Sequence, residues 1–329
     1  MIDFSEEAEQ TQPEQKGPKW SFSITTIMVA GFTSLAFIPL AILLSLSFPK
    51  IQQGFDEVIE NELIETSLIS KNSIEKWFNE LADSVIHESH TNTSKELLST
   101  LSSALKYSDL PLNEFIETDQ WDLYTQSYNE YYSHFSSMHE DFYDIFLINN
   151  EGDILFTLAR ETDLGTNLIN GPYKDSLFAQ TFTSVMNSTS TQFSDLEYYA
   201  PSGDTISGFI ISPIINDKYQ KVGAFALQIN FESAINLMTK SRHNSMINYV
   251  INDELMLRNK LNKIDHEDIL NTKIDNKLIN IWQTNNTASL STFELNETYT
   301  GFNSNSVIGI YHSLSELTAI FLFSSKACS

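Results

Sequence analysis

The chain has 329 residues, with 19 Lys and Arg against 43 Asp and Glu, and a formal net charge of −24 at pH 7. So acidic a surface repels the phosphates of nucleic acids and anionic lipids, which argues against a nucleic-acid-binding protein. The single cysteine, Cys328, excludes a disulfide within the chain and a cysteine cluster for zinc or an iron–sulfur centre.

An uncharged run follows an N-terminal tail. Residues 1–21 are acidic, polar and contain proline, which is typical of a disordered tail. The next 27 residues, 22–48, contain no charged side chain. As a helix rising ~1.5 Å per residue they would extend roughly 40 Å, enough to cross a hydrocarbon core of ~30 Å. This length, and the poor cleavage context of Ser47–Lys50, favour a membrane anchor over a cleaved signal peptide, whose apolar region is typically ~7–15 residues.

The distribution of basic residues predicts the orientation of this span. Lys16 and Lys19 precede it, and Lys50 is the only basic residue after it until Lys71. Positive residues favour the cytoplasmic side, so we expect a cytoplasmic tail, one span in the inner membrane and a large domain facing the periplasm or exterior. Two of the 19 basic and five of the 43 acidic residues precede Pro49, so that domain carries a formal charge of −21.

Residues 49–90 are predicted to form a long exit helix. Apolar side chains recur there at helical spacing, namely Ile74, Trp77, Phe78, Leu81 and Val85. This stripe could be half of a coiled-coil homodimer. It breaks register around 66–72, however, so docking against the chain's own domain is an equal alternative.

Two further helices are expected before the strands begin. One covers 95–107 and is ended by the sequence Ser108–Pro111. The other covers 121–141, where an aromatic stripe favours a helix packed on a sheet over a cofactor-binding aromatic box. The stripe consists of Trp121, Tyr124, Tyr128, Tyr131, Phe135 and Met138.

After residue 141 the pattern changes to that of strands. Two apolar runs, 144–149 and 154–158, flank the cluster Asn150–Asp153 and predict a hairpin. Gly152 can adopt the positive φ that such a turn needs. A turn region over 161–172, a helix over 173–186, strands over 191–199, 205–214 and 222–229, and a closing helix over 231–238 then follow. The short turns between the strands make them antiparallel neighbours.

The remaining residues repeat this order on a smaller scale. A hairpin is predicted over 246–251 and 254–258, with its turn at Asn252–Asp253. A polar loop and helix over 259–281 come next. The last strands are expected over 289–295, 307–312 and 318–323. The fold class is therefore α+β, with two antiparallel-sheet modules in series.

Four segments carry a resemblance to a known family: FYDIFLINNEGDILFTLARETDLGTNL from Phe142, SDLEYYAPSGDTISGFIISPI from Ser194, KVGAFALQI from Lys221, and INDELMLRN ending at Asn259. With the span and exit helix, they resemble the double Cache (PAS-like) sensor domains of bacterial chemoreceptors, diguanylate cyclases and histidine kinases. The resemblance implies a membrane-distal module over 91–240, a membrane-proximal module over 241–325 and a short tail over 326–329.

The resemblance also implies a function. The distal module would hold a small-molecule ligand between its sheet and the covering loop and helices, and ligand capture would drive chemotaxis or second-messenger signalling. A second span after 318–323 and an output domain are implied but are not part of these residues. The amino-acid-binding branch has an Asp on the last distal strand, where this chain has Gln228. This departure, and the lack of a clear carboxylate-binding motif, argue against an amine or amino-acid ligand.

Candidate ligand-binding residues follow from this arrangement, since binding sites combine aromatic walls with a few convergent polar groups. They are Tyr143, Asp144, Phe156, Arg160, Asp163, Asp195, Tyr198, Phe209 and Gln228. Glu197 and Tyr199 lie beside them, and because neighbouring strand residues face opposite ways, at most one of Tyr198 and Tyr199 can point inward. Asp163 could instead only cap or turn its own loop, and Arg160 could pair with Glu161 or Asp163.

No enzyme motif, metal signature or cofactor-binding motif is found in the sequence. The seven histidines form no His-Glu-x-x-His pattern. We therefore expect a non-enzymatic sensor that needs no cofactor and binds a small molecule. Two alternatives stay open: an anchored protein-interaction module without its own ligand, and the truncated input half of a diguanylate cyclase or histidine kinase.

Overall fold

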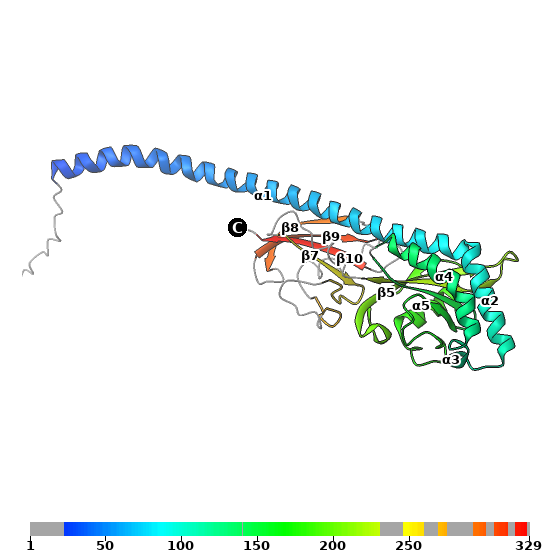
Figure 1. Cartoon of the computed structure of the whole chain (residues 1–329). Helices are drawn as coiled ribbons and strands as arrows, with labels where there is room; N and C mark the ends of the chain where they lie inside the picture. The colour runs from blue at the N-terminus through cyan, green and yellow to red at the C-terminus, as the bar shows by residue number, and fades with distance from the viewer. Residues whose placement is uncertain are drawn as a thin grey trace, which may run out of the picture. The chain divides into compact units, whose positions relative to one another are not determined.

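In the computed structural model the described residues are 23–139, 141–230, 246–259, 269–274, 292–300, 306–314 and 320–327 (Figure 1). They fall into two units, Met1–Val58 and Ile59–Ser329. The tail expected over 1–21 and the helix expected over 231–238 lie outside the described residues.

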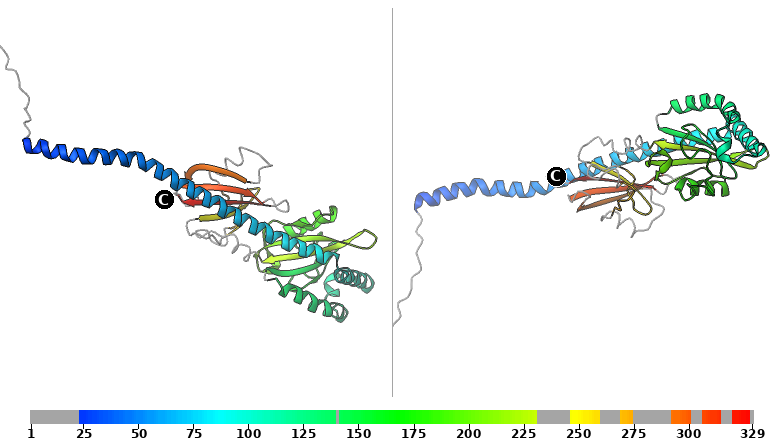
Figure 2. Two further views of the ribbon diagram at one scale, coloured as in Figure 1. Left: turned by 90° about the horizontal axis from the view of Figure 1, so that it is seen from above. Right: turned by 60° about the horizontal axis from the view of Figure 1, so that its bottom comes forward.

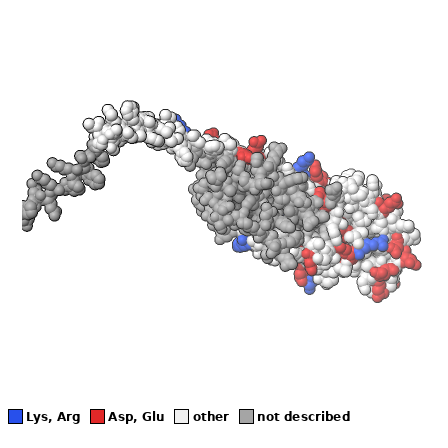
Figure 3. Space-filling model, turned by 60° about the vertical axis from the view of Figure 1, so that its left-hand side comes forward, with Lys and Arg blue, Asp and Glu red and all other residues white. Residues whose placement is uncertain are grey.

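The described part of the first unit is the start of helix α1 (Ile24–His90). Its residues Ile24–Phe55 are long and apolar enough to cross a membrane. Among the side chains of this stretch whose burial the structure describes, none is buried, and Ile24 and Leu35 are 76% and 75% exposed. In Figure 3 this stretch is drawn almost entirely without charged side chains. Apolar side chains left uncovered over such a length need a non-aqueous environment or another covering surface.

The part of α1 that belongs to the second unit docks against its own domain. All five residues of the expected apolar stripe, from Ile74 to Val85, are buried. Trp77 also donates from Nε1 to Oδ2 of Asp141 at 2.8 Å, which ties α1 to the start of the first sheet. Docking on the chain's own domain, one of the two alternatives for this stripe, is therefore confirmed.

Three helices follow α1, namely α2 (Asn92–Ser108), α3 (Leu112–Phe115) and α4 (Asp119–Ser137). The first and last begin at threonine N-caps, Thr91 and Thr118, whose hydroxyls accept backbone N–H groups. Helix α2 ends at Asp109, which adopts a left-handed conformation with φ 51°. The helices predicted over 95–107 and 121–141 are thus confirmed with shifted ends.

The first sheet is antiparallel and has the strand order β2-β1-β6-β5-β3, with β4 also paired to β5. Its strands are β1 (Phe142–Asn149), β2 (Ile154–Thr157), β3 (Gln192–Phe193), β4 (Glu197–Tyr199), β5 (Thr205–Ile215) and β6 (Lys221–Asn230). The predicted hairpin is confirmed, and Gly152 in its turn has φ 90°. A 3-10 turn, η1 (Ala200–Ser202), joins β4 to β5.

Two predicted elements differ from the structure. The strand expected over 191–199 is divided into β3 and β4. Between them, Ser194 keeps one backbone hydrogen bond to Phe209, its hydroxyl accepts the backbone N–H of Phe209, and the Asp195 carboxylate bonds to Arg258. Helix α5 (Leu177–Asn187) starts four residues later than expected, since Ser176 acts as its N-cap.

Helices cover both faces of the first sheet (Figure 2). The helical face packs against α1, α2 and α4 through a large apolar cluster that includes Trp77, Leu97, Trp121 and Leu227. The opposite face, here called the α5 face, packs against α5 through a second cluster that includes Phe146, Phe178 and Phe209. Residues alternate between these faces along each strand, so sequence neighbours enter different environments.

A second antiparallel sheet has the strand order β7-β10-β9-β8. Its strands are β7 (Met246–Asn252), β8 (Thr292–Thr300), β9 (Ser306–Ser313) and β10 (Ile320–Ala327). Only isolated bridges replace the strand expected over 254–258. The described part of the expected 259–281 loop and helix, 269–274, forms turns and a bridge. β10 reaches Ala327, so the tail expected from 326 is wrong for its first two residues.

Candidate functional site

Three buried side chains on the α5 face have oxygen atoms that accept no hydrogen bond from any residue that the structure describes. They are Asp144 on β1, Asp163 in the loop after β2 and Gln228 on β6, and none is more than 1% exposed. The atoms are Oδ2 of Asp144, Oδ1 of Asp163 and Oε1 of Gln228. We call these three residues the acceptor cluster. Buried polar atoms are nearly always hydrogen-bonded, so three orphaned acceptors on one face indicate a missing donor.

Asp144 is held by one oxygen only. Its Oδ1 accepts the backbone N–H of Ile145 at 2.7 Å and of Ala159 at 2.8 Å, whereas Oδ2 has no donor. The pKa of Asp144 is raised to about 7, mainly by burial; the two N–H bonds act against this shift, and the nearby charge of Asp163 adds to it. The neutral form of this carboxyl is therefore favoured well above the ordinary acidic range of aspartate.

Asp163 is anchored by Tyr199, whose hydroxyl donates to Oδ2 at 2.8 Å. Burial raises the pKa of Asp163 to about 6, although the Tyr199 hydrogen bond opposes the shift. Burial and the Asp163 charge also raise the pKa of Tyr199 well above its ordinary value, so this phenol stays a donor. Asp163 therefore does more than cap its own loop, which was the alternative considered from the sequence.

Gln228 lies directly opposite Asp144 in the β1–β6 pairing. Its Nε2 donates to the hydroxyls of Ser202 at 2.9 Å and Ser207 at 2.8 Å. Ser202 in turn donates to Oε2 of Glu161 at 2.6 Å. Since the Ser202 proton is used by a carboxylate, the atom of Gln228 beside Ser202 must be the donor nitrogen. The amide orientation is thereby fixed, and Oε1 is left without a donor.

A chain of hydrogen bonds forms the rim of the acceptor cluster. Tyr143, which is 41% exposed, donates from its hydroxyl to Oε1 of Glu161 at 2.6 Å. This hydrogen bond is the main reason that the pKa of Tyr143 is raised to about 12. Glu161 therefore joins the exposed Tyr143 to the buried Ser202 and, through it, to Gln228.

Aromatic rings fill the remainder of this face. Phe209, the neighbour of Gln228 across β5 and β6, stacks on Phe178 of α5 with ring centroids 4.0 Å apart. Tyr199 packs edge-on against Phe209 at 4.9 Å. Helix α5 is fixed by Glu197, whose two carboxylate oxygens accept the N–H groups of Leu177 and Phe178, both at 2.9 Å. Burial raises the pKa of Glu197 against these hydrogen bonds.

Five predicted site residues thus share the α5 face, and four lie elsewhere. Those brought together are Tyr143, Asp144, Asp163, Phe209 and Gln228. Phe156 points to the helical face, where its ring is 5.4 Å from that of Tyr132. Tyr198 also packs into the helical-face cluster, so Tyr199 is the inward residue of that pair.

The two remaining predicted residues, Arg160 and Asp195, lie away from the acceptor cluster, and each has another partner. Arg160 contacts Asp122 at 3.4 Å and lies over the Trp121 ring at 4.9 Å, rather than pairing with Glu161 or Asp163. Asp195 is bound by the buried guanidinium of Arg258 and by Nδ2 of Asn252. It joins the first sheet to the residues around β7 and does not face the acceptor cluster.

Sequence reasoning missed the polar partners Glu161, Ser202 and Ser207, and chose the wrong tyrosine. The short turn after Tyr199 contained the missing signal. Tyr199 pairs with Thr205, and in antiparallel strands paired residues point to the same face. Counting by twos from Thr205 through Ser207 to Phe209 places Tyr199 and Ser207 on the face already assigned to Phe209.

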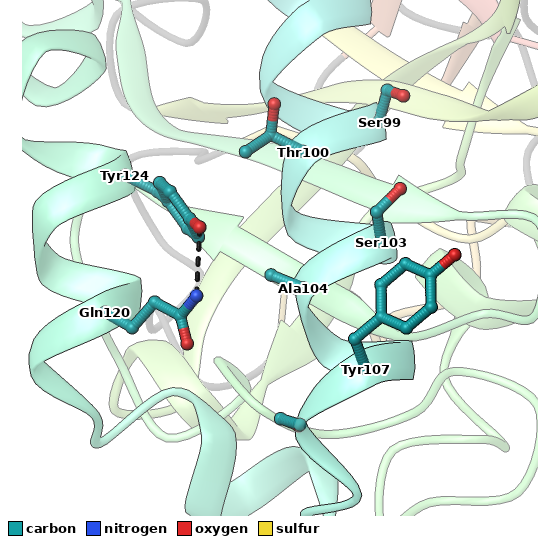
Figure 4. A pocket seen from close by; sticks show the side chains of 8 residues that line it. Ser99, Thr100, Ser103, Ala104, Tyr107, Gln120 and Tyr124 are labelled. Carbon is teal, nitrogen blue, oxygen red and sulfur yellow. Dashed lines mark hydrogen bonds between the residues drawn. The ribbon is translucent and has the colours of Figure 1, made fainter.

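Two surface hollows lie on the helical side of the domain. One, of about 410 Å³, runs between α2 and α4 and is lined by hydroxyl and amide side chains, among them Ser99, Ser103 and Gln120. Figure 4 shows these side chains, with Gln120 donating to the Tyr124 hydroxyl at 2.9 Å. The other, of about 990 Å³, borders α2 and the turn before β6. Neither hollow includes a residue of the acceptor cluster. The described residues contain no group of three metal-ligating side chains.

Comparisons with known proteins agree on the fold. No protein-family profile matches the chain, and no curated protein is similar to it in sequence. Among solved structures, the extracellular domain of vpHK1S-Z8, described as a histidine kinase, aligns with a TM-score of 0.53 at 12% identity, covering 84% of this chain and 92% of that one. The extracellular domain of mmHK1S-Z2, likewise described, gives 0.51 at 10% identity, covering 82% and 98%.

This chain has the fold of Cache-type extracytoplasmic sensor domains. A weaker likeness is to the ligand-binding domain of the Pseudomonas aeruginosa amino-acid chemoreceptor PctB in complex with L-Arg, with a TM-score of 0.48 at 11% identity, covering 82% of this chain and 96% of that one. The acceptor cluster lies on the face of the Cache-type sheet that α5 covers. The solved structures that this chain resembles are sensor domains, so the expected α+β fold of a sensor domain is confirmed.

Proposed function

We propose that this protein is a membrane-anchored extracytoplasmic sensor that binds a small molecule at the acceptor cluster. The observation that supports it most directly is the presence of three buried oxygens without donors, on Asp144, Asp163 and Gln228. An unsatisfied buried acceptor costs about 1–3 kcal/mol. A ligand that supplied donors to the open oxygens not already satisfied by a proton would recover this cost, which provides a driving force for binding.

The chemistry of the site favours a ligand group that donates hydrogen bonds and carries positive charge. All three open positions are acceptors, and two belong to carboxyl groups. An ammonium or guanidinium group has donors only, so it suits such a site. The amide at Gln228 argued against an amine, but Asp144 lies directly across from it and supplies the carboxylate from the neighbouring strand.

Binding at this site would act through the segments that cover it. Glu197 holds the first turn of α5, and Asp195, two residues earlier, holds Arg258 beside β7. The segment Asp195–Glu197 is therefore bonded both to α5 and to Arg258 beside β7. A ligand that displaces α5 or the loop around Asp163 would move this segment. Population shift of this kind typically supplies 1–3 kcal/mol of coupling between sites.

Membrane anchoring through Ile24–Phe55 completes the proposed sensor. The stretch is uncovered by protein and is of spanning length. A homodimer through the exit helix stays a proposal for the exposed side of α1, which includes Ile69 and Ile86 at 45% and 38% exposure. The opposite side of α1, the stripe from Ile74 to Val85, is buried against the domain itself.

A thermal-shift screen of the full chain in detergent micelles tests the proposal. We expect primary amines and guanidinium compounds to raise the unfolding temperature, and their neutral isosteres to leave it unchanged. The response should be lost in Asp144→Asn and kept in Asp122→Asn, whose carboxylate is exposed on the helical side. If no compound stabilises the wild type, or if Asp144→Asn responds like the wild type, the sensor site is not the acceptor cluster.

A second function is favoured by the aromatic packing. Phe178 and Phe209 stack tightly, and the α5 face is filled by side chains. A filled face is what an anchored protein-interaction module without its own ligand would show. Such a module would give no stabilisation by any small molecule in the screen, but would form a complex with a protein partner in a cross-linking experiment on intact membranes.

A further inference from the structure

The open oxygens of Asp144 and Gln228 face the same side of the sheet from directly paired positions. Directly opposed residues on one face of antiparallel strands have Cβ atoms about 4.5–5.5 Å apart. Oδ2 of Asp144 and Oε1 of Gln228 are both buried and both lack a donor. Two acceptors in such positions cannot bond to each other unless one of them holds a proton.

We propose that the ligand-free domain keeps a proton on Oδ2 of Asp144, which donates to Oε1 of Gln228, and that ligand binding displaces this proton. One proton satisfies two of the three orphaned acceptors at once. This inference rests on the proposed function only for its second half, because the acid–amide pair exists in the ligand-free state.

The fixed orientation of Gln228 is what makes the proton necessary. With a flipped amide, Nε2 would donate to an ionised Asp144 and no proton would be needed. That orientation would put the amide oxygen against Ser202, whose own proton is donated to Glu161. Two acceptors would then meet at 2.9 Å, so the flipped amide is excluded as long as Glu161 accepts from Ser202.

The groups around Asp144 favour its neutral form. The loop after β2 contributes Asp163 and Glu161, and β4 contributes Tyr199 and Glu197. β6 and β5 contribute only the uncharged Gln228 and Ser207, and β1 itself adds Tyr143 at the rim. No Lys or Arg in the described residues forms an ion pair with Asp144 or Asp163. A second negative charge is therefore not balanced within the cluster.

Exchange of this proton for a cationic ligand would link sensing to pH. The proton leaves Oδ2 for solvent, and an ammonium or guanidinium group takes its place as the donor, so the charge of the site is conserved. No covalent bond forms or breaks. Because the proton competes with the ligand, affinity should rise as pH rises through the range in which Asp144 ionises, and should level off above it.

Infrared spectroscopy of the full chain in detergent tests the ligand-free pair directly. As pH rises we expect a protonated carboxyl band that persists to about pH 7 in the wild type. In Asp144→Asn the last such band should be lost near pH 6, where Asp163 ionises. Asp122→Asn, which removes an exposed carboxylate, should keep the band. In Gln228→Met the band should remain but move to higher frequency, since the acid has lost its acceptor.

Specific outcomes would overturn the proposal. They are a band that still persists to about pH 7 in Asp144→Asn, a wild-type band lost entirely in the ordinary acidic range of aspartate, or an unchanged frequency of the Asp144 band in Gln228→Met. If Asp144→Asn does not fold, the frequency shift in Gln228→Met decides alone. All these measurements are made without ligand. A failed ligand screen would refute the sensor site but not the acid–amide pair, and a failed infrared test would refute the acid–amide pair but not the sensor site.

Discussion

Both faces of the first sheet bury apolar side chains, but they treat polar groups differently. On the helical face, Trp121 donates to the carbonyl of Leu155, and Tyr132 shares a hydrogen bond with Ser94. On the α5 face, Asp144, Asp163 and Gln228 each keep an unused acceptor. Buried polar groups are retained without partners mainly where they serve something other than stability. The site that we propose lies on the α5 face, and the helical face supports the sheet beneath it.

Truncating a buried side chain on the helical face should have the largest effect on the free energy of unfolding. Trp121 is 1% exposed, and Trp121→Ala would leave a large cavity between α4 and the sheet. We expect a loss of about 3–5 kcal/mol in the free energy of unfolding, measured by urea denaturation followed by circular dichroism. Leu123→Ala on the same helix, at a residue 70% exposed, is the control and should change stability by less than about 0.5 kcal/mol. Equal losses of stability in both variants would contradict the view that the buried helical face stabilises the sheet.

Breaking the Asp195–Arg258 ion pair between the two sheets should cause the second-largest loss of stability. Asp195→Ala would leave the guanidinium of Arg258 buried without its carboxylate. Breaking a buried pair costs about 3–5 kcal/mol, and since the Asp195 side chain is 30% exposed we expect about 2–3 kcal/mol. Asp122→Ala breaks the exposed Arg160 pair and should cost less than about 1 kcal/mol. The difference between the two variants is the quantity to measure.

A smaller effect is expected in the pH dependence of stability. The pKa of Asp163 is about 6 in the folded domain and ordinary in the unfolded chain, so the folded state binds the proton more tightly. Stability should therefore fall as pH rises from about 4 to about 6. In Asp163→Asn that fall should be reduced by about 1–2 kcal/mol. Asp217→Asn, in the exposed β5–β6 turn, should follow the wild-type curve. A steeper curve in Asp163→Asn would reverse the proposed sign.

Helix caps on the two faces should differ by the smallest amount. Thr118 caps α4 alone, and Thr118→Ala should cost about 1 kcal/mol. Ser176 caps α5, but Glu197 also accepts two N–H groups of its first turn. Ser176→Ala should therefore cost about 0.5 kcal/mol or less, and should approach the cost of Thr118→Ala only when Glu197→Gln is added. Thermal unfolding of the four variants in one buffer makes this comparison.

Local pattern in the sequence determined the element order, the fold class and the apolar stripe of α1. Helical spacing from Ile74 to Val85 and the Gly152 turn predicted structure correctly because hydrophobic periodicity and turn chemistry act over short distances. Asp144 and Asp163 are candidates from their places around the predicted sheet, whereas Gln228 is a candidate through the family resemblance; the structure brings all three to one face.

Only the tertiary structure decided which partners these side chains have. Asp195 and Arg258 are 63 residues apart and Gln228 and Ser202 are 26 apart, and no local pattern distinguishes a bonded carboxylate from an open one. The division of 191–199 into two strands turned Asp195 toward Arg258 and Glu197 toward α5. An open acceptor is energetically costly only when it is buried. The burial of the open oxygens of Asp144 and Gln228 depends on all the elements packed around them, so the acceptor cluster could be recognised only in the folded chain.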